Sequence, residues 1–116
     1  MPKILLLEDD FLIAFDMKAH LEEAGFEIIG PFARNEDAAE HVAFGALDAA
    51  VLDMDLGGQD SFPTASGLQA RDIPFVFVSG NDRAELPSGL AECPVHTKPV
   101  VFSVLIEDLS DVIARG

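Results

Sequence analysis

Three short stretches of this chain are apolar at nearly every position, with no regular alternation of polar residues. They are Lys3–Leu7, Ala49–Asp53 and Phe75–Val78. A strand with one face in water alternates apolar and polar residues, whereas a parallel strand covered on both faces reads as a continuous apolar run. The three stretches therefore predict parallel strands inside a sheet that has helices on both faces.

The segments between these strands have apolar residues at helical spacing. We expect helices over Phe11–Ala24, Glu36–Phe44, Phe62–Arg71 and Val101–Ala114, and two further short strands over Glu27–Gly30 and Val95–Thr97. Gly25 ends the first helix, Asn35 is a candidate cap of the second, and Pro31 stops the strand between them. Five strand–helix units with right-handed crossovers predict a doubly wound α/β sandwich.

One of the expected helices is interrupted. The segment Asn81–Ala91 lies where a fourth helix belongs, but it contains Pro87 and Gly89. Proline removes a helical hydrogen bond, and glycine costs roughly 1 kcal/mol relative to alanine inside a helix. We expect this helix to be short or irregular.

The composition limits the class of protein. A chain of 116 residues with 49% apolar residues fits one domain, which we expect to span 1–116 with no output domain after Gly116. It has no signal peptide and no membrane-spanning run, so we expect a cytoplasmic protein with no membrane partner. The net charge of −14 argues against direct nucleic-acid binding. The lone Cys93 is expected to be a half-buried small hydrophobe.

Polar and charged residues follow the carboxyl ends of four of the predicted strands. Glu8–Asp10 follows the first strand, Asp53 ends the third, Ser79 and Gly80 end the fourth, and Lys98 follows the fifth. In doubly wound sheets, ligands bind at the carboxyl ends of the strands. The fold therefore predicts one site that contains several carboxylates, a hydroxyl and a lysine.

A divalent cation relieves the repulsion between carboxylates gathered in this way. Mg²⁺ prefers oxygen ligands and usually takes one or two carboxylates together with waters and a phosphate oxygen. We expect Asp9 and Asp53 to be direct ligands, Glu8 to act through water, and the main-chain carbonyl of Asp55 to be a further ligand. Asp10 is more plausible as the cap of the first helix.

The same residues predict phosphoryl transfer. Asp53 would be the nucleophile, and Lys98 would contact Asp53 or a phosphoryl oxygen. The Ser79 hydroxyl and the Gly80 N–H could hold another phosphoryl oxygen. A carboxylate nucleophile, a metal and donors around the equatorial oxygens are the parts that such a reaction requires.

With these residues, the chain resembles a response regulator receiver domain, the phosphoacceptor of two-component signalling. The family's acidic pair matches Glu8 and Asp9, its phosphoacceptor matches Asp53, its hydroxyl residue matches Ser79, and its lysine matches Lys98. The resemblance covers essentially the whole chain. A finer resemblance, to stand-alone receivers, is carried by Leu56-Gly57-Gly58 after the acceptor and by Phe-Val-Ser-Gly at 77–80.

The resemblance implies a flavodoxin-like five-stranded parallel sheet with strand order 2-1-3-4-5 and a cis Lys98–Pro99 bond. It implies that a sensor histidine kinase or histidine phosphotransfer protein phosphorylates Asp53 with Mg²⁺ as cofactor. The phosphorylated domain would then contact an unknown downstream protein, as a monomer or weak phosphorylation-dependent dimer. It would dephosphorylate slowly and would not be an enzyme with a diffusible product.

The chain departs from the family at the position three residues before the lysine. Receivers carry Tyr or Phe there as a conformational switch, and this chain has Val95. We therefore expect the switch to lie in the loop from Ser79 to Ser88. Asp55 either faces the water that hydrolyses the acyl phosphate or is a solvated loop acid. The three histidines are expected to be solvated or locally hydrogen-bonded: His20, His41 and His96.

Two other functions compete with this interpretation. One is a receiver fold that binds a protein without being phosphorylated. The other is a haloacid-dehalogenase-type phosphatase, whose Asp-x-Asp motif resembles Asp53-Met54-Asp55. Those enzymes carry the nucleophile on the first strand, whereas here the acids of the first strand precede Asp53, and the chain is short for a substrate cap.

Overall fold

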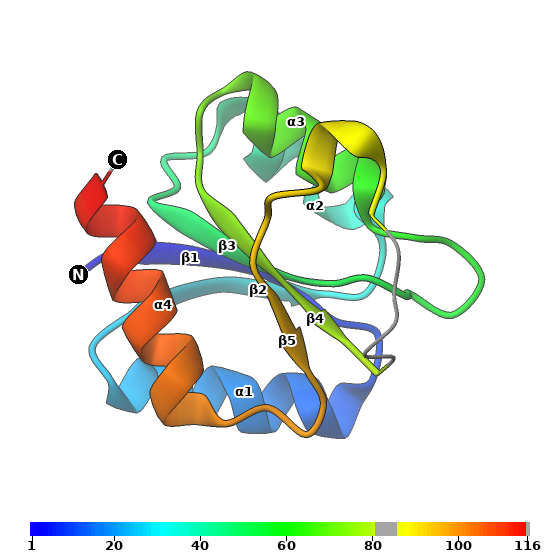
Figure 1. Cartoon of the computed structure of the whole chain (residues 1–116). Coiled ribbons are helices and arrows are strands. Elements are labelled where there is room, and N and C mark those ends of the chain that lie inside the picture. The colour runs from blue at the N-terminus through cyan, green and yellow to red at the C-terminus, as the bar shows by residue number, and fades with distance from the viewer. Residues whose placement is uncertain (81–85, 116) are drawn as a thin grey trace.

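A computed structural model describes residues 1–80 and 86–115 of the chain. Five parallel strands form one sheet in the order β2-β1-β3-β4-β5 (Figure 1). The strands are β1 Lys3–Leu7, β2 Glu27–Phe32, β3 Ala49–Asp53, β4 Phe75–Ser79 and β5 Val95–Thr97. The helices are α1 Phe11–Glu23, α2 Asn35–Phe44, α3 Phe62–Ala70 and α4 Phe102–Arg115, with a 3-10 turn, η1, at Ser88–Leu90. The predicted fold class and strand order are confirmed.

Helices cover both faces of the sheet, as the continuous apolar strands require. In Figure 1, α1 and α4 lie on one face and α2 and α3 on the other. Alternate residues of each central strand point into two separate apolar cores. In β1, for example, Ile4 and Leu6 pack towards α1 and α4, while Leu5 and Leu7 pack towards α2 and α3. The residues of both cores are buried, so a site that binds a ligand is expected at the ends of the strands.

The strand β2 is longer than the sequence predicts. It continues through Pro31 to Phe32, and its pairing with β1 shifts between Leu5 and Leu7. The prediction that Pro31 stops this strand is wrong, because β2 is an edge strand and a missing N–H is tolerated there. Gly30 has φ +114°, and a Cβ on it would lie 2.8 Å from the carbonyl oxygen of Leu6.

The start of α2 also differs from the prediction. Helix α2 begins at Asn35 itself, with Arg34 in the cap position and no side-chain cap hydrogen bond. The prediction that Asn35 caps the helix is therefore wrong. Its side chain instead contacts the segment between β3 and α3. Pro63 lies in the first turn of α3, where the missing N–H of a proline costs no helical hydrogen bond.

Part of the expected helix at Asn81–Ala91 lies outside the described residues, namely 81–85. In the described remainder, the only regular element is the short 3-10 turn η1. Within that remainder, the prediction of a short or irregular helix is confirmed. Among the described residues, no helix is both long and apolar enough to cross a bilayer.

Candidate functional site

The strand register brings the predicted site residues to one edge of the sheet. Leu7 pairs with Leu52, and Asp53 pairs with Val78 on the next strand. Ser79 pairs with Thr97, so the residues that follow β1 and β5 reach the same edge as the end of β3. Parallel strands end together, and a doubly wound sheet leaves this edge open between its helices.

A lysine and two buried carboxylates form the centre of the site. Nζ of Lys98 lies 3.1 Å from Oδ2 of Asp53 and 2.9 Å from Oε1 of Glu8. Glu8 is 3% exposed and Asp53 is 4% exposed, whereas the Lys98 side chain is 22% exposed. One lysine is therefore shared by two acids that have lost most of their contact with water, and its single positive charge balances only one of them.

The remaining oxygens of these acids are held by the backbone. Oε2 of Glu8 accepts a hydrogen bond from the Asp10 N–H at 3.1 Å. Oδ1 of Asp53 accepts one from the Asp55 N–H at 3.1 Å. Each carboxylate is thus fixed by one main-chain donor and one contact to Lys98.

Burial has opposite consequences for the acid and the base of this cluster. It raises the pKa of Glu8 to about 8, with a further increase from the neighbouring Asp53, against the opposing effects of Lys98 and the Asp10 N–H. Burial alone would lower the pKa of Lys98. Its hydrogen bonds to Glu8 and Asp53 outweigh burial and leave that pKa above its usual value. Without another cation, Glu8 therefore holds a proton near neutral pH.

Asp9 completes an acidic cluster suited to a metal. Carboxylate oxygens of Glu8, Asp9 and Asp53 all lie within 4.8 Å of one another. Asp9 is exposed, so the cluster is open to solvent on one side. Three hard oxygen donors, an open side and an acid with a raised pKa fit a divalent cation such as Mg²⁺.

The loop from 54 to 61, here called the 54–61 loop, is folded tightly beside this cluster. Asp55 and Asp60 form an antiparallel bridge, and Leu56 N–H donates to the Gln59 carbonyl at 2.8 Å. Gly57 has φ +69°, and a Cβ on it would lie 2.9 Å from Oδ2 of Asp9. A glycine therefore lets the loop pass close to the acidic cluster.

Other predicted site residues occupy the same edge in different ways. Ser79 is 5% exposed, and its carbonyl oxygen accepts from the Lys98 N–H at 2.7 Å. Gly80 is the last described residue before the gap, and a Cβ on it would meet no atom of the described residues within 4 Å. The Lys98–Pro99 bond is cis, as the resemblance implied. Asp55 is exposed, and its Oδ1 accepts from the Gly57 N–H at 3.0 Å.

Asp10 is a helix cap, as expected. Its Oδ1 accepts from the N–H groups of Leu12 and Ile13 at 3.0 and 3.1 Å. It does not belong to the acidic cluster formed by the three acids named above. Val95, at the family's aromatic position, is 39% exposed.

The histidines and the cysteine have local structural roles. Nδ1 of His20 contacts the Asp16 carbonyl at 2.8 Å, and His96 Nε2 lies 2.7 Å from Oδ2 of Asp108. The His41 ring packs against Phe32. Cys93 is half-buried, and burial raises the pKa of its thiol, which opposes thiolate formation.

Sequence reasoning missed a polar network behind the 54–61 loop. Asn35, Gln59 and Thr64 join α2, the loop and α3 through side-chain hydrogen bonds. The signal available in the sequence was a helix-start asparagine, which is also the signal of a simple cap. Only the juxtaposition of α2 with the loop distinguishes the two roles.

The comparison with curated proteins finds a mycobacterial relative. The chain is 26% identical over 117 residues to the transcriptional regulatory protein PdtaR of Mycobacterium tuberculosis. The match covers 97% of this chain but only 57% of that protein, so the chain spans about half the length of its curated relative. No protein-family model matches the chain.

Solved structures share the fold over almost the whole chain. A response regulator receiver protein of Sinorhizobium medicae superposes with a TM-score of 0.86 at 24% identity, covering 97% of this chain and 94% of that one. SdrG of Sphingomonas melonis superposes at 0.83 with 35% identity and 97% coverage of both chains. The magnesium-bound receiver domain of the sensor histidine kinase PA1611 of Pseudomonas aeruginosa superposes at 0.82 with 21% identity, covering 97% and 98%.

These comparisons agree with the fold described above. SdrG combines an identity above 30% with nearly complete coverage of both chains. The strand order, the buried aspartate at the end of β3 and the lysine after β5 are all found in this chain. The chain belongs to the family of response regulator receiver domains of two-component signalling.

Proposed function

We propose that the chain accepts a phosphoryl group on Asp53 from a sensor histidine kinase or a histidine phosphotransfer protein. The observation that carries this proposal is the position of Asp53. It is a buried carboxylate at the end of β3, contacted by Lys98 and adjacent to two further acids. A carboxylate held in this way is a nucleophile in a fixed position. Lys98 balances its charge on one side, and the acidic cluster leaves it accessible to a ligand on the other.

The transfer conserves atoms and charge in two steps. A carboxylate oxygen of Asp53 forms a bond to phosphorus while the bond from phosphorus to the donor's imidazole nitrogen breaks, and the electron pair leaves with that nitrogen. Water later attacks the phosphorus of the acyl phosphate, releases inorganic phosphate and restores the Asp53 carboxylate. The domain is thus a substrate that promotes its own phosphorylation and resets slowly.

Mg²⁺ is the cofactor that the donor set supports. Asp9 and Asp53 would hold it directly, Glu8 through water, and the Asp55 carbonyl would be a further ligand. When bound, the ion neutralises charge on the phosphoryl oxygens. The related receiver domain with magnesium in its active-site cleft supports this assignment.

Lys98, Ser79 and Gly80 would contact the transferred group. Lys98 already lies at the acceptor oxygen, so a phosphoryl oxygen can replace one of its two carboxylate contacts. Ser79 ends the neighbouring strand β4 and Gly80 follows it, and they offer a hydroxyl and an N–H. On phosphorylation, Lys98 would lose a contact to Glu8 or Asp53 and gain a contact to the phosphoryl group. This exchange would be the local change that alters the surface of the domain.

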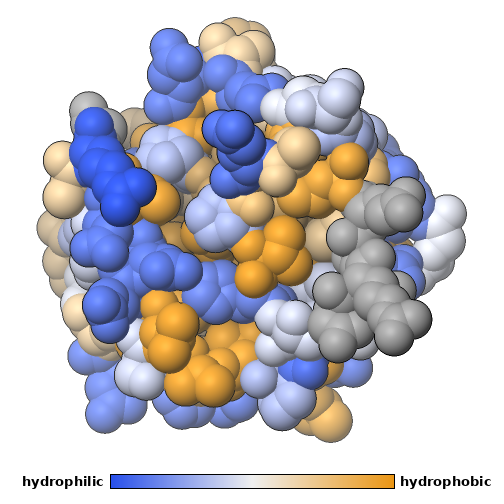
Figure 2. Space-filling model, viewed as in Figure 1, coloured by the Kyte–Doolittle hydropathy of each residue, from blue (hydrophilic) through white to orange (hydrophobic). Residues whose placement is uncertain are grey.

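We propose that the change caused by phosphorylation alters the binding of another protein. Half of the expected switch loop, Ser79 to Ser88, lies outside the described residues, at 81–85. Several large apolar side chains are exposed around the site edge and on α4, and Figure 2 shows hydrophobic side chains gathered over the beginning of α4. They include Phe11, Leu12, Val101 and Val104. Exposed apolar residues in such numbers suit contact with a protein partner.

The direct test is intact mass after incubation with acetyl phosphate and Mg²⁺. The expected result is one phosphoryl adduct on the wild-type chain and none on Asp53→Asn or after chelation. An adduct that persists in Asp53→Asn would refute the proposal. Absence of any adduct would favour a receiver that binds its partner without phosphorylation. Continuous release of phosphate from a small phosphate ester would instead indicate a phosphatase.

A further inference from the structure

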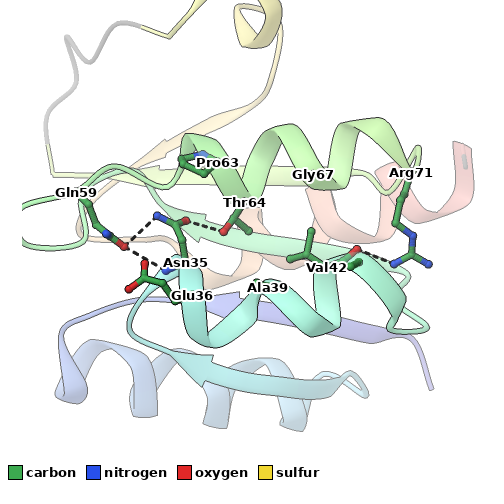
Figure 3. A pocket seen from close by; sticks show the side chains of 10 residues that line it. Asn35, Glu36, Ala39, Val42, Gln59, Pro63, Thr64, Gly67 and Arg71 are labelled. Carbon is green, nitrogen blue, oxygen red and sulfur yellow. Dashed lines mark hydrogen bonds between the residues drawn. The ribbon is translucent and has the colours of Figure 1, made fainter.

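Asn35 lies at the start of α2, with its side chain directed at the 54–61 loop (Figure 3). Its Nδ2 donates to the Gln59 side-chain oxygen at 3.0 Å and to the Asp60 carbonyl at 2.8 Å. Its main-chain N–H also contacts the Gln59 side-chain oxygen at 3.2 Å. Both bonded residues belong to the arm of the loop that returns towards α3.

Thr64 sets the orientation of this amide. Its Oγ1 donates to Oδ1 of Asn35 at 2.6 Å. The Asp60 carbonyl can only accept, so Nδ2 of Asn35 must face it, and the oxygen of the amide must then face Thr64. All three polar functions of the Asn35 side chain, two N–H donors and one oxygen, are thereby used. Thr64 is buried, which adds to the cost of leaving its hydroxyl without a partner.

The returning arm is in turn bonded to the arm that leaves Asp53. Asp55 and Asp60 form a bridge, Ser61 N–H donates to the Met54 carbonyl at 3.2 Å, and Leu56 N–H donates to Gln59. The Asp55 N–H holds an oxygen of Asp53. A contact made at Asp60 is thus linked through the Asp55–Asp60 bridge to Asp55, whose carbonyl is a proposed ligand and whose N–H bonds the acceptor Asp53.

We propose that Asn35, oriented by Thr64, is a positioning residue for the metal site. It fixes the 54–61 loop so that the Asp55 carbonyl and Gly57 lie correctly against Asp53 and Asp9. This inference rests on the proposed function of Asp53 and Mg²⁺, and it assigns a role in that site to α2, which carries none of its ligands. Outer residues that orient metal ligands typically affect metal affinity by a factor of about 10 or more.

The network also lies at one end of a groove between α2 and α3 with a volume of about 570 Å³. At the other end, Arg71 donates from Nη1 to the Val42 carbonyl at 2.8 Å, as Figure 3 shows. This second hydrogen bond also joins the C-terminal end of α3 to α2, but it does not touch the loop. Arg71→Met is therefore a matched control for general loosening of the two helices.

The test compares the Mg²⁺ dependence of phosphorylation in Asn35→Ala, Thr64→Val, Thr64→Ser and Arg71→Met. We expect the Mg²⁺ concentration for half-maximal rate to rise about tenfold in Asn35→Ala and by a smaller factor in Thr64→Val. The rate at saturating Mg²⁺ should stay within about twofold, because the nucleophile and Lys98 are unchanged. Thr64→Ser, which retains the hydroxyl, and Arg71→Met should both behave like the wild type.

Calorimetric titration with Mg²⁺ alone gives a second readout without phosphoryl transfer. Unchanged affinity in both Asn35→Ala and Thr64→Val would overturn the inference while leaving the proposed function intact. An equal loss in Arg71→Met would also overturn it. If the wild type binds Mg²⁺ but is never phosphorylated, the proposed function fails, and the titrations alone decide the role of Asn35. If the wild type binds no Mg²⁺, both fail.

Discussion

The ammonium group of Lys98 lies 2.9 Å from Oε1 of Glu8, a carboxylate that is almost completely buried. Even with this partner, burial raises the pKa of Glu8 to about 8. The pair therefore controls the charge that the site presents to a cation at neutral pH.

Mg²⁺ affinity should rise with pH up to about 8. An acid with a raised pKa keeps its proton below that value, so the cation must displace the proton, and above it the site is already charged. We expect up to about a tenfold gain per pH unit between pH 6 and 8. Calorimetry in two buffers with different ionisation enthalpies measures the released proton, which suits a chain without Trp or Tyr. Glu8→Gln should remove this pH dependence, and a flat profile in the wild type would contradict the prediction.

Lys98→Met should separate metal binding from phosphoryl transfer. The lysine competes with a metal for the oxygens of Glu8 and Asp53, so its removal should leave Mg²⁺ affinity unchanged or increased. Loss of a cation at the reacting oxygens should slow phosphorylation by about 100-fold. Calorimetry and a time course of intact mass measure the two effects. Lys18→Met makes the same charge change elsewhere and should alter neither, and equal loss of both properties in Lys98→Met would argue against this division of roles.

Gly57→Ala should weaken metal binding through Asp9. Both Gly57 and Gly58 have positive φ, +69° and +120°, so alanine at either position costs roughly 1 kcal/mol or more of folding stability. Only at Gly57 would the new Cβ meet Oδ2 of Asp9, at 2.9 Å; at Gly58 it meets nothing within 4 Å. Urea denaturation should show a lower free energy of unfolding in both variants. Mg²⁺ titration should show a lower affinity only in Gly57→Ala. An equal loss of Mg²⁺ affinity in Gly58→Ala would show that strain at positive φ, and not contact with Asp9, weakens metal binding.

His96 and Asp108 should stabilise the packing of α4 against β5 together. Their side chains approach to 2.7 Å across the two elements, with the histidine mostly buried and Asp108 partly exposed. Because solvent screens the acid, we expect a coupling of about 0.5–1 kcal/mol in a double-mutant cycle with alanine. Urea unfolding followed by circular dichroism measures this coupling. Additive effects of the two substitutions would show that the contact contributes no coupling.

The buried parts of this protein are predictable from its sequence. Continuous apolar runs identify β1, β3 and β4, and the residues that follow them identify the acids of the site. Because parallel strands end at a common edge, the order of residues along the chain is enough to place Glu8, Asp9 and Asp53 together. Such inferences depend only on strand direction and burial.

The remaining features depend on neighbours that a sequence does not reveal. Pro31 is tolerated in β2 because that strand lies at the edge of the sheet, and edge position follows from strand order. Asn35 at the start of a helix predicts a cap, but the same residue type also serves as a loop contact. The two roles differ only in whether Gln59 and Asp60 lie opposite, which is a tertiary property.

The site residues are far apart along the chain and close together in the sheet. Asp9, Asp53 and Lys98 are separated by more than forty residues at each step, yet they meet at the ends of β1, β3 and β5. An unfolded chain therefore keeps no local remnant of the site. Any free energy released when a cation or phosphoryl group binds there is also free energy of folding, spread over most of the sheet. Hydrogen exchange of the central strands should slow whenever the site is filled, even where those strands do not touch the ligand.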